Sequence, residues 1–120
     1  MRRIKVIKLG TKCTDIATGL KGTLTHWTYN LGNNITYVFQ PDDCNPETGQ
    51  SVNRVYLEIE RLKFKKSNLE EVDVPTEILG KLVKDKASGV DGMVTEFMYN
   101  TEGCFHVVIQ PKGILKNTRL

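Results

Sequence analysis

The chain has 120 residues, of which 39% are hydrophobic and 26% charged, and its formal net charge is +3. This composition is typical of a globular protein, and the length suits one ordinary domain or two very small ones. The 17 basic and 14 acidic residues are mixed along the chain, so we do not expect a nucleic-acid-binding protein. Apolar runs are too short for a membrane span, and residues 1–10 do not resemble a secretory signal. We expect a cytosolic product.

The three cysteines predict neither a disulfide framework nor a structural zinc site. They are Cys13, Cys44 and Cys104, an odd number with wide spacing and no Cys-x-x-Cys pair. We interpret them as small, partly buried apolar residues.

The sequence repeats itself after 70 residues without a gap. Residues 9–41 and 79–111 share Leu9/Leu79, Gly10/Gly80, Asp15/Asp85, Ala17/Ala87, Gly19/Gly89, Gly22/Gly92, Thr25/Thr95, Tyr29/Tyr99, Asn30/Asn100, Val38/Val108, Gln40/Gln110 and Pro41/Pro111. Shared glycines and a turn-capping Asp are residues that a backbone shape requires, so we predict two copies of one structural unit.

In the first copy, β-strands are predicted over residues 12–15, 23–30, 35–40 and 52–62. Thr18-Gly19 is a tight turn capped by Asp15, and Gly22 marks a close backbone approach at the start of the next strand. Residues 30–34 form a hairpin turn. The alternation in residues 35–40 and 52–62 predicts an inner face formed by Ile35, Tyr37, Phe39, Val55, Leu57 and Ile59.

A charged connector is expected over residues 63–76, with one helical turn near residues 67–71. The second copy then repeats the pattern, with strands over 82–85, 93–100 and 105–110, and with Phe105, Val107 and Ile109 on the inner face. Only nine residues follow Pro111. Either a shorter loop places residues 118–120 where residues 60–62 stand in the first copy, or the closing strand is absent and an edge is open.

The fold predicted from these elements is all-β: two tandem small SH3-like β-barrels, the first over residues 1–62 and the second over 77–120. Curling four or five short strands into a small barrel removes the exposed edges of a flat sheet. The Gly-x2-Gly turn is similar to that of the KOW type of such barrels.

No catalytic centre is predicted. The histidines, His26 and His106, occupy non-equivalent positions of the repeat, and no nucleophile, phosphate-loop or metal-ligand motif occurs. We therefore expect no enzyme, no cofactor and no metal. The acidic pair Asp42-Asp43 is interpreted as a solvated turn.

Aromatic and basic side chains provide the only candidate binding residues. Trp27 and Tyr29 match Phe97 and Tyr99, two residues apart on one strand face, and could line a peptide or nucleotide groove or fill the core between the copies. Candidate phosphate contacts are Lys8, Lys12 and Lys84, and a solvated face is the alternative interpretation of this basic region.

The shared pattern Leu-Gly-x4-Asp-x-Ala-(Thr/Ser)-Gly-x2-Gly, followed by Gln-Pro, resembles a family of small tailed-bacteriophage proteins of unassigned function. The second copy fits best, through residues 84–86, 88–92, 103–104 and 110–111. The first copy departs at Thr14, where the family has lysine, and at Asn33-Asn34, where it has Gly-Cys. The resemblance implies a viral origin and assigns no catalytic residue.

Two functions follow as hypotheses. The first is a structural or assembly protein, a virion adaptor or decoration component that contacts capsid, neck or tail proteins as an oligomer or as part of a larger assembly. The alternative is a phage accessory protein, free in the host cytoplasm, that binds a host factor or sequesters a signalling nucleotide.

Overall fold

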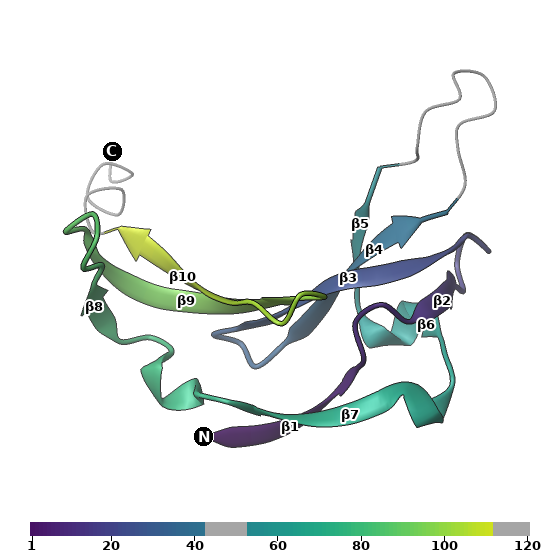
Figure 1. Cartoon of the computed structure of the whole chain (residues 1–120), viewed down its shortest axis with the longest axis horizontal. Helices are drawn as coiled ribbons and strands as arrows, with labels where there is room; N and C mark the ends of the chain where they lie inside the picture. Colours follow the sequence, from purple (N-terminus) through teal and green to yellow (C-terminus); the bar gives the residue numbers. More distant parts are fainter. Residues whose placement is uncertain (43–52, 112–120) are drawn as a thin grey trace.

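The protein is an all-β, antiparallel structure. The computed structural model describes residues 1–42 and 53–111, and within them no α-helix forms. The strands are β1 (Arg2–Ile7), β2 (Lys12–Asp15), β3 (Lys21–Asn30), β4 (Ile35–Pro41), β5 (Val55–Leu57), β6 (Leu62–Lys63), β7 (Leu69–Val74), β8 (Leu82–Lys84), β9 (Asp91–Asn100) and β10 (Phe105–Pro111), joined in part by 3-10 turns η1 (Ile59–Arg61), η2 (Lys66–Asn68) and η3 (Thr76–Ile78). Figure 1 shows their arrangement.

The repeat in the sequence is a repeat in the strand registers. β2 pairs with β3 through Lys12↔Thr23, and β8 pairs with β9 through the equivalent Leu82↔Met93. The β3–β4 and β9–β10 hairpins carry a bulge at the same place, one residue after Leu24 in β3 and one residue after its counterpart in β9. The two stretches that match in sequence therefore share their strand registers, including an irregularity of the sheet.

The shared turn residues have the roles predicted for them. Gly19 and Gly89 adopt φ of 75° and 74°, which favours glycine. A Cβ on Gly22 would collide with the Gln40 carbonyl oxygen and with the Phe39 ring, and Gly92 is equally enclosed by β10. A side chain at either position would push the two hairpin strands apart.

The two copies are joined about a pseudo-two-fold axis. β3 pairs antiparallel with β9, and the centre of the pairing is Thr28↔Met98. β1 pairs antiparallel with β7, where Arg3 lies opposite Asp73. The pairs Thr28↔Met98 and Arg3↔Asp73 each join residues 70 positions apart, since 98 − 28 = 73 − 3 = 70, which is also the repeat length. Through β3 and β9, each copy therefore contacts the other with the equivalent strand, as the subunits of a symmetric dimer do.

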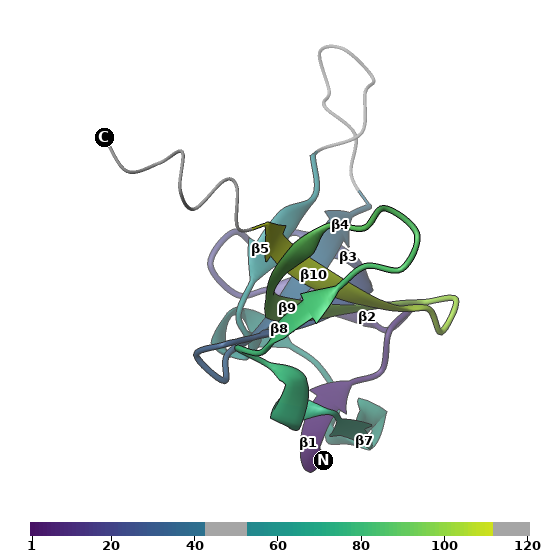
Figure 2. The ribbon, with the colours of Figure 1, turned by 90° about the vertical axis from the view of Figure 1, so that its left-hand side faces the viewer.

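The β1–β7 pair lies beneath the arc of the eight-stranded sheet, as Figures 1 and 2 show from two directions. Its inner residues Val6, Ile7 and Val74 are fully buried. Ile7 also donates its backbone N–H to the hydroxyl of Tyr37 at 3.0 Å, which ties β1 to β4. The segment expected to be a charged connector, residues 63–76, thus contains the core strand β7. In place of the helical turn expected near residues 67–71, the structure has the 3-10 turn η2 at Lys66–Asn68.

One core runs through both copies. Its largest fully buried side chains come from β3, β4 and β9 together with β1 and β7, and they are Trp27, Tyr29, Tyr37, Phe39, Phe97, Ile7, Leu24, Val6, Val74 and Val94. Because residues of both copies share this core, neither copy buries its apolar face alone.

The strands do not close into a barrel within the described residues, so the expected pair of closed barrels is not observed. In the first copy, β5 pairs with β4 and β6 pairs with β2. The single closing strand predicted over 52–62 is wrong, because η1 separates β5 from β6; residue 52 lies outside the described part. Of its expected inner face, Leu57 is buried, whereas Val55 and Ile59 are exposed.

The second copy is more exposed than the first. Tyr37, Val38 and Phe39 of β4 are buried beside β5, whereas the equivalent Val107 and Val108 of β10 are each 37% exposed. In the described part of the chain, β10 pairs only with β9 and β8 only with β9. The expected inner face of residues 105–109 is therefore only half covered, and expected closing residues 118–120 lie outside the described part.

Candidate binding sites

A basic groove of about 720 Å³ lies on the first copy, between the β1–β2 turn and the segment that joins β6 to η2. Its ten lining residues are Lys8, Leu9, Gly10, Thr11, Lys12, Thr14, Lys63, Phe64, Lys65 and Asn68. The Lys8 N–H donates to the Asn68 carbonyl at 2.8 Å and fixes the two walls of the groove relative to each other. This backbone hydrogen bond therefore holds together the two segments that carry the basic side chains of the groove.

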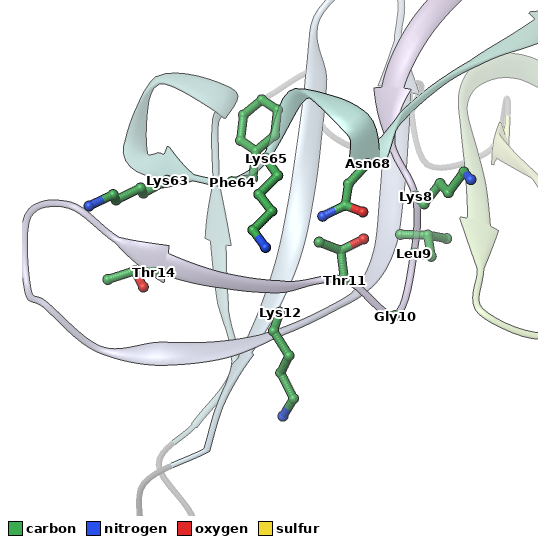
Figure 3. Close-up of a pocket in the computed structure, with 10 residues that line it drawn as sticks. All are labelled: Lys8, Leu9, Gly10, Thr11, Lys12, Thr14, Lys63, Phe64, Lys65 and Asn68. Atoms are coloured by element: carbon green, nitrogen blue, oxygen red, sulfur yellow. The ribbon is translucent and has the colours of Figure 1, made fainter.

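Four of the lining residues are lysines and none is acidic. Figure 3 shows Lys65, Asn68 and Thr11 directed toward one another, whereas Lys12 extends away from them. Lys12 donates to the Asp42 carboxylate at 2.9 Å, and among the described residues it is the only one of the four lysines in an ion pair. The groove can thus attract an anionic group through the remaining lysines, with Phe64 as an apolar wall.

The aromatic residues singled out in the sequence meet at the junction of the two copies. Trp27 stacks on Tyr99 with ring centroids 4.1 Å apart and an interplanar angle of 17°. Phe105 lies against both Tyr99 and Phe97, at 4.8 and 5.2 Å. Of these pairs, only Trp27–Tyr99 crosses from one copy to the other, and it stabilises the junction by roughly 0.5–1.5 kcal/mol beyond the area that it buries. The two Phe105 pairs join β9 to β10 within the second copy.

The remaining candidate residues are dispersed. Tyr29 is buried and donates to the Asn33 side chain at 2.8 Å, while Lys84 lies exposed on β8 in the other copy. Lys8 lines both the basic groove and a smaller pocket of about 320 Å³ beside Trp27 and Tyr99. The structure therefore brings Lys8 and Lys12 together, and Trp27 and Tyr99 together, but it does not join all seven residues in one site.

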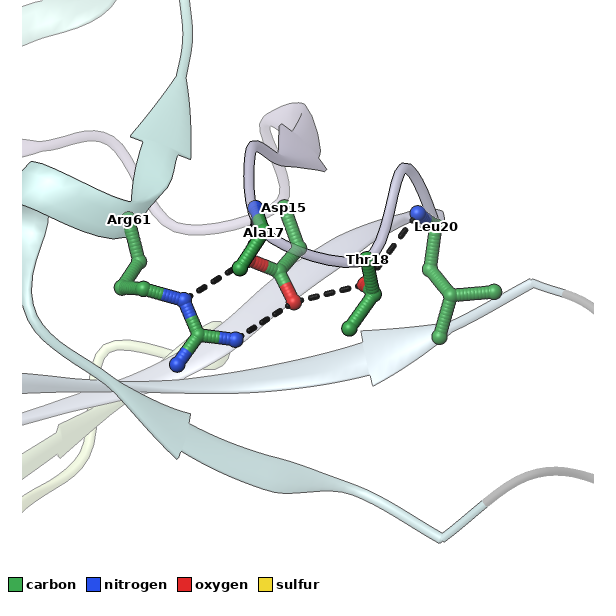
Figure 4. A network of polar contacts seen from close by, with 5 residues as sticks. All are labelled: Asp15, Ala17, Thr18, Leu20 and Arg61. Carbon is green, nitrogen blue, oxygen red and sulfur yellow. Dashed lines mark hydrogen bonds and ion pairs between the residues drawn. The ribbon is translucent and has the colours of Figure 1, made fainter.

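Asp15 is the most strongly held ionisable group of the described chain. Its carboxylate accepts from Arg61 Nε at 2.9 Å and Nη2 at 2.8 Å, from the Thr18 hydroxyl at 2.7 Å and from the Ala17 N–H at 3.1 Å (Figure 4). The Arg61 hydrogen bonds, followed by the Thr18 bond, lower the pKa of Asp15 to about 2. The turn cap was predicted, whereas the arginine, 46 residues away, was not.

In the second copy, Asp85 makes the cap without the arginine. It accepts from the Ser88 hydroxyl at 2.6 Å and from the Ala87 N–H at 3.2 Å, and these bonds lower its pKa. The side chain of Asp15 is 3% exposed, while Asp85 lies at the surface. One acidic position is thus buried and ion-paired in the first copy and open in the second.

No group of metal-ligating side chains occurs within residues 1–42 and 53–111. His26 contacts the neighbouring Thr25 hydroxyl at 2.9 Å, and His106 is exposed on β10. Of the cysteines, Cys13 is buried, which raises its pKa, whereas Cys104 is exposed, contrary to the expectation of partial burial. Cys44 lies outside the described residues. Neither histidine lies on the basic groove.

The chain matches no protein-family model, no curated protein and no solved structure. No helix in the described part of the chain is long and apolar enough to cross a membrane. Assignment of function therefore depends on the geometry of this chain itself.

Proposed function

We propose that this protein is a non-enzymatic bacteriophage structural or assembly protein, a virion adaptor or decoration component that works through protein–protein contacts. The observation that carries the proposal is the outer edge of β10, which is unpaired within the described residues, whereas the equivalent edge of β4 in the first copy is covered by β5. The sequence resemblance to small tailed-phage proteins supports the viral origin.

The exposed edge has the properties of a docking strand. Val108 is 37% exposed, whereas its counterpart Val38, on the strand that pairs with β5, is 3% exposed. Phe105, at the start of β10, adds further apolar surface at 41% exposure. An exposed apolar strand edge binds an extended partner segment through main-chain hydrogen bonds and alternate side-chain contacts.

We also propose that each copy derives from an SH3-like barrel. The strand order β5-β4-β3-β2-β6 of the first copy, with one 3-10 turn between β5 and β6, supports this relationship. In this arrangement the second copy has the first three strands of the unit, and a partner supplies the covering that β5 gives.

Purified phage particles test the proposal. We expect mass spectrometry to detect the protein in them, and we expect Val108→Lys to reduce its incorporation, because the substitution places a charge at the docking edge. Ile16→Lys is the matched control, since Ile16 is 62% exposed in a turn away from this edge. Absence of the wild-type protein from particles would contradict the proposal.

A second function is favoured by the basic groove, which brings Lys8 and Lys12 together. There the protein would sequester a phosphate-bearing nucleotide in the host cytoplasm. We expect a cyclic dinucleotide or ADP-ribose to raise the melting temperature if this function is correct, and Lys65→Ala to abolish the shift. If neither probe raises it, this second candidate fails, and the particle experiment is unaffected.

A further inference from the structure

We propose that β8 and β10, the two outer strands of the second copy, bind one continuous segment of a partner protein. Its sequence has the form apolar-x3-Arg-Leu, and its arginine pairs with Asp85. The template for this segment is the stretch 55–63, which covers the same two edges of the first copy. The inference rests on the proposed function, since both use the β10 edge, and it specifies the chemistry of the partner.

In the first copy, a single stretch of chain covers both edges. β5 pairs with β4, where Leu57 lies opposite Tyr37. After the turn η1, β6 pairs with β2, where Leu62 lies opposite Asp15. Both leucines are buried, at 5% and 4% exposure. Residues 55–63 are therefore long enough to cover both edges of one unit.

The arginine of this stretch fixes its position on the unit. Arg61 donates to the two carboxylate oxygens of Asp15 at 2.9 and 2.8 Å, and its carbonyl oxygen accepts the Ile16 N–H at 2.8 Å. Two parallel charge-assisted hydrogen bonds give specificity of geometry as well as binding energy. The arginine therefore determines where along the two edges the stretch binds.

The second copy keeps the groups that this stretch contacts. The strand registers of the two copies agree, so Asp85 and Val107 are placed as Asp15 and Tyr37 are. Asp85 has the same turn cap, lies at the surface, and forms no ion pair within the described residues. Val107 is 37% exposed, whereas Tyr37 is 1% exposed. An acid beside an uncovered apolar strand is complementary to an arginine that follows an apolar residue.

Asp85 gives the edge a way to select its partner. The main chain of an edge strand offers hydrogen bonds to any extended segment, and selection comes from side chains at defined positions. In the template, Arg61 follows Leu57 by four residues, with η1 between them. A partner segment with this spacing places its apolar residue opposite Val107 and its arginine at Asp85, whereas a segment without the arginine leaves Asp85 unpaired.

A labelled peptide with the sequence of residues 54–63, titrated into the full chain and followed by fluorescence anisotropy, tests the inference. We expect it to bind. Arg61→Ala in the peptide and Asp85→Asn in the protein should each raise the dissociation constant at least about tenfold. In the Asp85→Asn protein, the peptide change should have little further effect, because the two groups act on each other.

Two exposed glutamates provide matched controls. Glu58→Ala in the peptide removes a charge that makes no contact with the unit in the template, and Glu102→Gln in the protein removes an acid at the far end of the β9–β10 hairpin. Both should leave the dissociation constant unchanged. They show whether a loss of affinity comes from Arg61 and Asp85 specifically or from a change in net charge.

Two results would overturn the inference. If the peptide does not bind, the edges do not take a segment of this form, and Val108→Lys in particles then still tests the proposed function by itself. If the peptide binds and Asp85→Asn leaves its affinity unchanged, the arginine binds elsewhere and Asp85 selects no partner.

Discussion

Replacing Asp15 and Asp85 separately by Asn compares the same position in its two environments. Both carboxylates cap a turn of the same shape, through Thr18 in one copy and Ser88 in the other. Only Asp15 also accepts two hydrogen bonds from Arg61. The difference between the two variants therefore measures what the arginine contributes.

The expected size follows from the pKa of Asp15. A carboxyl whose pKa falls from an ordinary value to about 2 is stabilised in its charged form by roughly 2 kcal/mol. Because the Arg61 side chain is 45% exposed, solvent screens part of this interaction, and we expect Asp15→Asn to cost about 1–2 kcal/mol of unfolding free energy at neutral pH. Asp85→Asn should cost clearly less, since that side chain lies at the surface.

The pH dependence has a definite sign. Because the folded-state pKa of Asp15 is depressed, its contribution is complete above the unfolded-state value of about 4 and disappears as the pH falls toward 2. Urea unfolding of wild type and both variants at pH 6 and pH 2.5 measures this. A gap between wild type and Asp15→Asn that stays constant at both pH values, or equal losses in the two variants, would refute the reasoning.

Three further predictions concern packing and can be measured by urea or thermal unfolding. Phe39→Ala should cost about 3–5 kcal/mol, because the ring is fully buried, and Ile109→Ala should cost less, because that side chain is partly exposed; equal losses would contradict the difference in covering. Gly22→Ala should destabilise by about 1–3 kcal/mol, because its Cβ would overlap the neighbouring strand, and an unchanged melting temperature would mean that the hairpin is looser than described. Tyr37→Phe should cost about 1–2 kcal/mol, because the buried Ile7 N–H loses its acceptor, and wild-type stability would show that another acceptor replaces it.

Much of each copy could be predicted from the sequence, because its signals are local. Positive φ at Gly19 and close packing at Gly22 follow from chemistry that acts over a few residues. The hairpin strands followed from alternation over five or six residues. A match between two stretches 70 residues apart then strengthened every local prediction.

The contacts between distant segments could not be predicted in the same way. β7 contains Val72 and Val74 alternating with charged residues, a pattern that fits a half-buried strand, but its acidic residues suggested a connector. Nothing local indicates that β3 will pair with β9. The Arg61 partner of Asp15 becomes visible only when the chain returns to β2 after η1.

The candidate site was predictable only in part. Lys8 and Lys12 do share the basic groove, but Lys63 and Lys65 reach it through the same return of the chain that places Arg61. The sequence analysis left two interpretations of the aromatic residues open, a binding groove and a packed core between the copies. Trp27 and Tyr99 stack on each other across the junction, and binding at these rings stays a prediction.

Pairing of the two copies about an internal two-fold axis is the central claim, and cross-strand nuclear Overhauser effects test it most directly. We expect backbone contacts that link Thr28 with Met98 and Arg3 with Asp73. Observing the hairpin contacts within each copy while both of these links are missing would contradict the account.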